Sequence, residues 1–221
     1  MKSILFAFIA ITWSLCTTAQ VKEGQVKYAI EMTSDDPNVQ SQLAMLNGSK
    51  MDMVFSEKFS RVDFSMGMFL QVVTVTDLDA NNGLLLMSGV TGNTAVVMTA
   101  EDVEKTAEEA PEFQIEATKE TKKILGYKCT KYILTTEEGT DVSYWTTTEI
   151  NASKTNNRYM NKSIEGFPLL FETEANAMKM TFTATEFKEG LKGLNTKELF
   201  DMSIPEGYEE MTMEELEGMG M

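Results

Sequence analysis

Apolar and polar residues alternate along most of the chain after residue 25. From Val26 to Met32 every second residue is apolar, and the residues between them are mostly polar. A period of two is typical of a strand with one buried side and one solvent-facing side. The same alternation, or a short apolar run, predicts further strands at 51–55, 62–66, 69–76, 84–87, 94–98, 113–123, 127–135, 140–148, 169–173 and 178–187. The pattern therefore predicts a mainly β fold.

Short turn signals separate the predicted strands. Glu57-Lys58 and Glu138-Gly139 each lie between two strands, Gly126 joins another two, and Asn82-Gly83 is a strong hairpin dipeptide. The segment 77–83 also resembles the start of a calcium loop, but its glycine comes one place late and a serine occupies the twelfth position. We interpret this segment as a turn, and we expect antiparallel strands joined by hairpins.

Three short helices are predicted between and after the strands. The first begins at Asp36-Pro37, where a capping side chain precedes a proline, and ends at Asn47-Gly48. The second begins at Thr99 and ends before Pro111, with acidic residues in its first turn. The capping-box pattern of 212–215 introduces either a short acidic helix or a frayed tail.

The N-terminal segment has the pattern of a secretory signal peptide. Lys2 precedes an apolar run from Ile4 to Leu15, and Thr17-Thr18-Ala19 supplies the small residues before a cleavage point. The run is too short to span a bilayer, which requires about 20 residues. We expect an exported protein, periplasmic or extracellular, without a transmembrane segment. Lipid attachment at Cys16 is an alternative that we favour less, because the residue before it is leucine rather than a small residue.

These boundaries divide the chain into three parts. We predict a signal peptide at 1–19, one antiparallel β domain at 20–210 and an acidic, methionine-rich C-terminal tail at 211–221.

Composition excludes several classes of function. The chain has 34 acidic and 19 basic residues, and its net charge of −15 disfavours binding to nucleic acid. It has no histidine, and Cys129 is the one cysteine that remains after cleavage. The usual general base, the commonest metal ligand and the usual activator of a serine or cysteine nucleophile are therefore lacking. We expect a non-enzymatic protein with no catalytic residue, no metal site and no cofactor.

Methionines recur two residues apart. On a strand, this spacing places both thioethers on one face of the sheet. Three interpretations stay open: an adaptable wall for a lipid or another apolar ligand, core filler, and a Cu(I) site of soft thioethers. We favour a wall or filler, because the period of two requires only an apolar residue at each position. The five pairs are Met51/Met53, Met66/Met68, Met178/Met180, Met211/Met213 and Met219/Met221.

Several short motifs stand out in the second half of the chain. They are Gly126-Tyr127-Lys128-Cys129 with Tyr132, Tyr144-Trp145, Gly166-Phe167-Pro168-Leu169 and 204–211. We interpret the motif residues themselves as a turn, a packed cysteine and aromatic side chains between strands. Together with the order of the predicted elements, the motifs resemble an uncharacterised family of secreted bacterial domains, which is allied to the lipoprotein-carrier half-barrel of LolA and LolB. The resemblance implies a single LolA-like half-barrel domain over residues 20–210, with a curved sheet around an apolar cavity that helices close and that holds acyl chains.

We therefore predict a mainly β (α+β) fold, a curved antiparallel sheet or LolA-like half-barrel with a few short covering helices. Its concave face would hold a hydrophobic small molecule, a lipid or an acyl chain, and the first helix would cover part of it. One alternative is a structural or interaction module with a filled core and a protein partner in the envelope, and a further one is Cu(I) binding. The predicted ligand-binding residues are Tyr28, Ile30, Met32, Leu43, Leu46, Met51, Met53, Phe55, Val62, Phe64, Met66, Met178, Met180 and Phe182.

Overall fold

The computed structural model describes residues 21–43, 46–67, 69–90, 92–108, 112–137, 139–150, 152, 163–175 and 178–218. The predicted signal peptide with Cys16 lies outside these residues, and so do Met68, Met219 and Met221.

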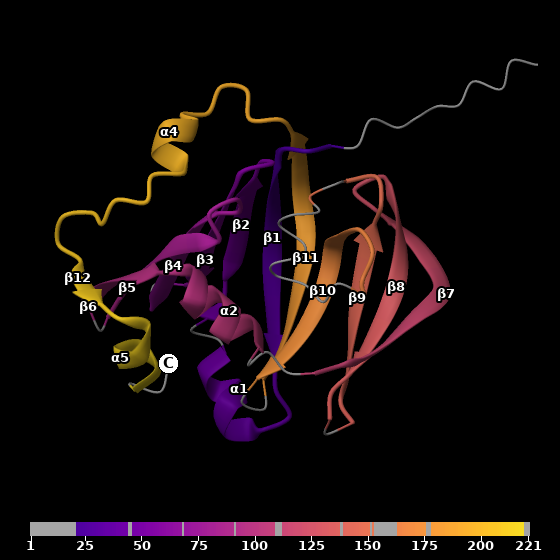
Figure 1. Ribbon diagram of the computed structural model, residues 1–221. Helices are drawn as coiled ribbons and strands as arrows, with labels where there is room; N and C mark the ends of the chain where they lie inside the picture. The colour runs from indigo at the N-terminus through magenta and orange to yellow at the C-terminus, as the bar shows by residue number, and fades with distance from the viewer. Residues whose placement is uncertain are drawn as a thin grey trace, which may run out of the picture.

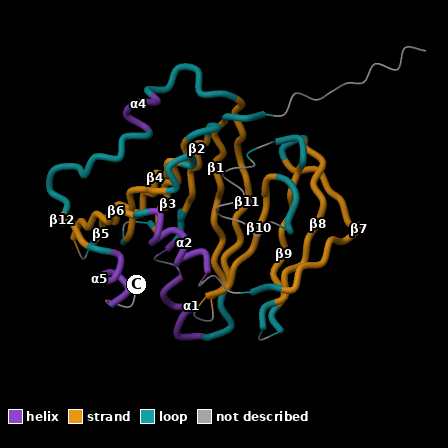
Figure 2. Tube along the Cα trace, viewed as in Figure 1, coloured by secondary structure: helices purple, strands orange, loops and turns teal. Residues whose placement is uncertain are grey.

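One sheet of twelve strands dominates the structure (Figures 1 and 2). This sheet confirms the prediction of a mainly β fold. Its strands agree closely with the segments predicted from alternation. They are β1 (Gly24–Thr33), β2 (Lys50–Phe55), β3 (Phe59–Met66), β4 (Leu70–Asp77), β5 (Asn82–Gly89), β6 (Gly92–Met98), β7 (Gln114–Ile124), β8 (Tyr127–Thr135), β9 (Asp141–Thr147), β10 (Phe167–Ala175), β11 (Met178–Glu189) and β12 (Glu209–Met211).

The strands lie in the order β12-β6-β5-β4-β3-β2-β1-β11-β10-β9-β8-β7. The pairing of β12 with β6 is parallel, and the other neighbouring pairs are antiparallel. Two meanders, β2 to β6 and β7 to β11, therefore meet at the N-terminal strand β1. The sheet is open, with β12 and β7 at its two edges.

Ring contacts show that the sheet is concave on one face. Phe55 of β2 lies 5.3 Å from Phe167 of β10 between ring centroids, although β1 and β11 separate the two strands. Phe64 of β3 similarly lies 6.4 Å from Phe182 of β11 across β2 and β1. In a flat sheet, positions three strands apart are about 14 Å from one another. The sheet must therefore curve toward the face that carries these rings.

The described helices are short. They are α1 (Pro37–Leu43), α2 (Ala100–Glu108), α4 (Thr196–Leu199) and α5 (Met213–Gly218). α2 begins after Thr99, as predicted: the Thr99 hydroxyl accepts the Asp102 N–H at 3.2 Å, and the Asp102 carboxylate accepts the Thr99 N–H at 2.7 Å. Figure 1 shows α1, α2 and α5 grouped beside the β1–β6 half of the sheet, with α4 apart from them.

α1 is described from Pro37 to Leu43, and Leu46 lies in a short 3-10 turn. One local prediction differs from the structure. Asn82 and Gly83 begin β5, and the turn before them is closed by the Asp77 carboxylate, which accepts the N–H groups of Asp79 and Ala80 at 2.9 Å. Gly83 is required there for close packing, because a Cβ atom would lie 2.7 Å from the Val75 carbonyl oxygen.

The C-terminal segment packs against the sheet and was not foreseen as part of it. Phe200 stacks on Phe59 of β3 at 5.3 Å, and the Arg61 guanidinium donates to the Leu199 carbonyl oxygen at 3.0 Å. In the predicted tail, Met211 pairs with Val96 of β6 and Leu216 of α5 is buried. Residues 211–218 thus belong to the folded structure.

Candidate functional site on the concave face

Apolar side chains from neighbouring strands share the concave face. Strand register places Met51 of β2 between Tyr28 of β1 and Phe64 of β3. It also places Met32 of β1 opposite Met180 of β11. Alternate residues of each strand point to the same side of a sheet, so these side chains form continuous rows across it.

One end of this face is filled by the protein's own side chains. We call it the packed end and define it as Val26, Tyr28, Phe55, Phe167 and Leu169. Phe55, Phe167 and Leu169 have 0% of their surface exposed. Val21, Ile150 and Ala152, which lie outside the long strands, are also buried in this cluster. The packed end therefore has the character of an ordinary hydrophobic core.

Tyr28 of β1 links the packed end to β10 by a hydrogen bond across the sheet. Its side chain is 2% exposed, and its hydroxyl donates to the Pro168 carbonyl oxygen of β10 at 2.7 Å. Burial raises the pKa of Tyr28 far above its usual value, because an ionised phenolate would lose its hydration there. The buried phenol is thus neutral and hydrogen-bonded, as a buried tyrosine requires.

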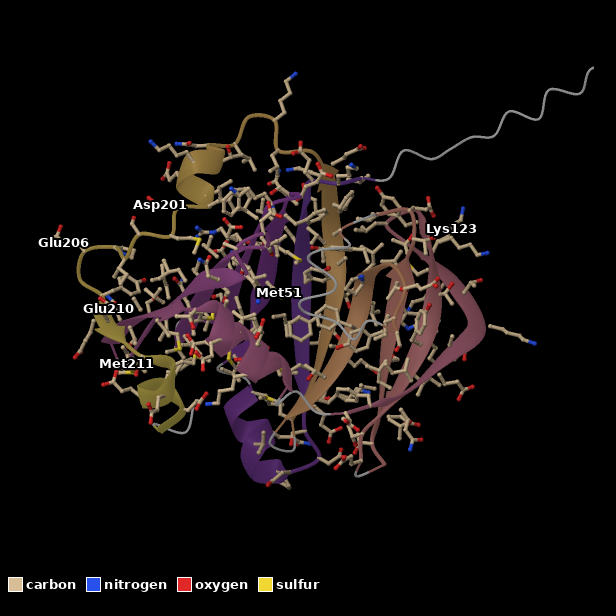
Figure 3. The ribbon with its side chains drawn as sticks, viewed as in Figure 1. Met51, Lys123, Asp201, Glu206, Glu210 and Met211 are labelled. Carbon is tan, nitrogen blue, oxygen red and sulfur yellow. The ribbon has the colours of Figure 1, made fainter. Side chains whose placement is uncertain are left out.

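The other end of the face is partly exposed. We call it the methionine end and define it as Met32, Met51, Phe64, Met66 and Met180. All five side chains are half-buried, and all except Met66 pack against the same core cluster as the packed end. Figure 3 labels Met51 toward the middle of the molecule, away from the two sheet edges. Apolar surface that remains accessible on a concave face is the feature expected of a site for an apolar ligand.

Stacked aromatic rings join the methionine end to the β9 side of the sheet. Tyr144 stacks on Phe171 with ring centroids 5.5 Å apart, and Phe171 stacks on Phe182 at 4.5 Å with the rings 6° from parallel. Phe64 completes the row beside Phe182. The row provides a rigid apolar wall beside the flexible methionines.

The structure separates the predicted ligand-binding residues by burial. The role of these residues in binding stays a prediction. Those that are buried are enclosed by the protein itself. The buried residues are Tyr28, Ile30, Met53, Phe55 and Phe182. The half-buried residues are Met32, Leu43, Leu46, Met51, Val62, Phe64, Met66, Met178 and Met180.

All five motif residues, Trp145 included, lie in turns or pack against apolar clusters. Gly126, at a φ of +89°, forms the β7–β8 turn, and Tyr127 meets the ring of Phe187 edge-on at 5.5 Å. Cys129 is buried, and this burial raises the pKa of its thiol, which disfavours the reactive thiolate. Tyr132 lies in a second, smaller cluster with Leu134 and others.

Trp145 differs from the other motif residues. It pairs in register with Lys131 of β8, and its partly buried indole packs against the same core cluster as the packed end. The Nζ atom of Lys122 lies 3.9 Å from the centroid of the Trp145 ring, and that of Lys131 lies 5.7 Å from it.

Sequence reasoning missed the β10 contribution to the face. The strand was predicted to begin at Leu169, yet Phe167 and Leu169 are both part of the packed end and Phe171 is the centre of the aromatic row. Alternate apolar residues at 167, 169 and 171 were the available signal. Pro168 and the irregular pairing with β9 between Pro168 and Leu170 obscured it.

Neither a metal centre nor a membrane-spanning helix is evident in the described part of the chain. Within the described residues, no group of three or more Asp, Glu, Cys or His side chains is placed to hold a metal ion. That search does not include methionine thioethers. The helices among those residues are all too short or too polar to cross a membrane.

Comparison with protein families gives one match, to a domain of unknown function, DUF4412, which covers residues 23–208. The chain belongs to the DUF4412 family. The match includes all the strands from β1 to β11 and both ends of the concave face. No curated protein matches this DUF4412 chain.

Of the solved structures similar to this DUF4412 protein, that of PNGF-II supports the fold, and nothing beyond the fold. The structure of PNGF-II aligns with a TM-score of 0.50 and 14% identity over 89% of this chain, which spans about a third (32%) of that protein. An uncharacterized conserved protein from Thermus thermophilus aligns with a TM-score of 0.44 and 10% identity, covering 85% of this chain and 90% of that one. A LolA superfamily protein from Nitrosomonas europaea gives a TM-score of 0.22 and 9% identity, covering 82% and 91%.

Proposed function

We propose that this DUF4412 protein is an exported, non-enzymatic binding protein that holds a lipid or acyl chain at the methionine end of its concave face. The observation that supports the proposal is the set of half-buried apolar side chains at this end, in which Met32 lies opposite Met180 and Met51 opposite Phe64, with Met66 two residues from Phe64 on β3. Export rests on the N-terminal sequence pattern described above.

The physical basis of binding is the removal of apolar surface from water. Each methylene group of an acyl chain that becomes buried contributes about 0.8 kcal/mol. Unbranched methionine side chains adapt to an irregular apolar partner, so chains of different length and saturation would fit. The packed end supplies a rigid floor, because its side chains are already enclosed.

A fluorescent fatty acid tests this proposal. Replacing Met51 and Met180 by glutamine places polar groups on the surface that the acyl chain would contact. We expect the double variant to bind the probe about tenfold more weakly, since a loss of about 1.4 kcal/mol corresponds to a factor of ten. Met213→Gln in α5 is the matched control, because Met213 is also half-buried but lies in the C-terminal segment. Equal binding by the double variant and the control would count against the site.

The filled-core alternative is supported by the packed end itself. Phe55 and Phe167 fill part of the concavity completely, as they would in a structural or interaction module. If neither the fatty acid nor other apolar dyes bind, this second function is favoured.

The Cu(I) alternative draws support from the pairing of Met32 with Met180. Titration with Cu(I) in the presence of a chromophoric chelator tests this alternative. If the protein binds Cu(I) no more tightly than the chelator does, Cu(I) binding is excluded as the function.

A further inference from the structure

Three neighbouring strands, β7, β8 and β9, bring two lysines to one tryptophan. Lys131 of β8 is the direct register partner of Trp145 in β9. Lys122 of β7 is opposite Cys129, two residues before Lys131, so both lysines point to the same side. Their Nζ atoms lie 3.9 Å and 5.7 Å from the centroid of the same ring.

The two ammonium groups are only weakly neutralised. Among the described residues, Lys122 has no carboxylate partner in a salt bridge, and the Lys131 ammonium lies 3.4 Å from an exposed Glu120 carboxylate. Burial and, to a lesser extent, the charge of Lys131 lower the pKa of Lys122, although the Cys129 thiol and Glu172 act in the opposite direction.

The neighbouring carboxylate of Glu172 is engaged by other groups. It accepts hydrogen bonds from the Ser143 N–H at 2.9 Å and from the Ser143 hydroxyl at 2.8 Å. Its other oxygen is 2.9 Å from the Lys179 ammonium. These partners engage both oxygens of Glu172, so its charge is shared with Lys179 and only partly offsets that of Lys122.

The charge of the surrounding hairpin has the same sign. Strands β7 and β8 contain five lysines and two glutamates, whereas the whole chain has a net charge of −15. Figure 3 shows Lys123 at the β7 side of the molecule, far from Glu206 and Glu210 near β12. An anion approaching this acidic protein is therefore attracted to the β7–β8 edge.

We propose that Lys122, Lys131 and Trp145 form a binding site for a divalent tetrahedral oxyanion, a phosphoryl group above all. Two ammonium groups beside one another suit two negative charges better than the single charge of a carboxylate. The indole holds both lysine side chains in place and shields one side of the site from water. The proposal does not depend on a ligand at the methionine end.

The fluorescence emission of Trp145 reports directly on this site. The chain has two tryptophans, Trp13 and Trp145, so Trp145 is the sole indole emitter in a Trp13→Phe background. Inorganic phosphate is titrated at constant ionic strength, with acetate as the monovalent comparison. We expect a saturable change in emission with phosphate, and a response at least tenfold weaker with acetate.

Two variants and one control assign the response to the lysines. Lys122→Gln and Lys131→Gln should each weaken phosphate binding about tenfold, because each removes one charge-assisted contact. Lys123→Gln should leave it unchanged, because alternate residues of β7 point to opposite faces. A thermal melt of each variant checks that the fold is intact.

Vesicles distinguish the sources of the phosphoryl group. A response to vesicles that contain phosphatidic acid, whose phosphomonoester headgroup carries up to two negative charges, but not to free phosphate assigns the site to a lipid headgroup, and the reverse assigns it to a free anion. Failure of phosphate and vesicles alike to give a saturable response overturns the proposal. A response that is the same in Lys122→Gln, Lys131→Gln and Lys123→Gln also overturns it.

Discussion

The packed end and the methionine end of the concave face share strands β1 and β2, yet they differ in what encloses them. Along β2, Phe55 and Met53 are buried while Met51 is half-buried. The packed end is closed by Phe167 and Leu169 of β10 and by Val21, Ile150 and Ala152. No comparable cluster of fully buried residues encloses the methionine end within the described part of the chain. One face therefore has two environments, a core and an accessible apolar surface.

The largest difference between the two ends should appear when a large ring is removed from each. Phe55→Ala should lower the free energy of unfolding by about 3–5 kcal/mol, because it leaves a cavity in a fully buried site. Phe64→Ala should cost about half as much, because its ring is already partly in contact with water. Urea denaturation measures both. Equal losses would show that the methionine end is as tightly packed as the other.

A methionine pair on one strand compares the two ends with the residue type held constant. Met53→Ala should cost about 2–3 kcal/mol, because Met53 is 8% exposed and its removal leaves a cavity. Met51→Ala should cost about 1 kcal/mol, because the side chain is only half-buried. Chemical denaturation gives the two values, and a larger loss for Met51→Ala would reverse the assignment of the two ends.

The alkaline limit of stability tests the packed end through Tyr28. Its pKa is raised in the folded protein, so this group favours folding below pH 10, the approximate pKa of an exposed tyrosine, and opposes it progressively above that. Tyr28→Phe should lose about 1–2 kcal/mol at neutral pH, since the Pro168 carbonyl loses its donor.

The decline in stability of Tyr28→Phe above pH 10 should also be shallower than that of the wild type. Burial raises the pKa of Tyr127 and Tyr144 as well, so some decline should remain in the variant. Identical slopes in Tyr28→Phe and the wild type would show that Tyr28 ionises without penalty.

Local sequence signals predicted most of the sheet. Alternation and short turns located the β2–β3 hairpin and β8 because both depend on residues close together in the chain. β12 could not be predicted, because three residues at 209–211 are fixed by parallel pairing with β6, more than a hundred residues earlier. α4 was missed for a related reason, since Phe200 beside it is held by a distant Phe59.

The candidate site was predictable in part. A period of two indicates which residues share a face, and it grouped Met32, Met51 and Met180 correctly. It carries no information on how deeply each position is buried, because that depends on Phe167 and Leu169 from a distant strand. The sequence does not show that two lysines lie beside Trp145, because only the register of β7, β8 and β9 brings these residues together.

Native mass spectrometry of the purified protein, combined with solvent extraction of any bound lipid, tests the proposed function most directly. We predict a mass excess that extraction removes and that is reduced in the double variant Met51→Gln with Met180→Gln. Recovery of no lipid in repeated preparations, together with no binding of a fluorescent fatty acid, would contradict the account and leave the concave face as a core filled by its own side chains.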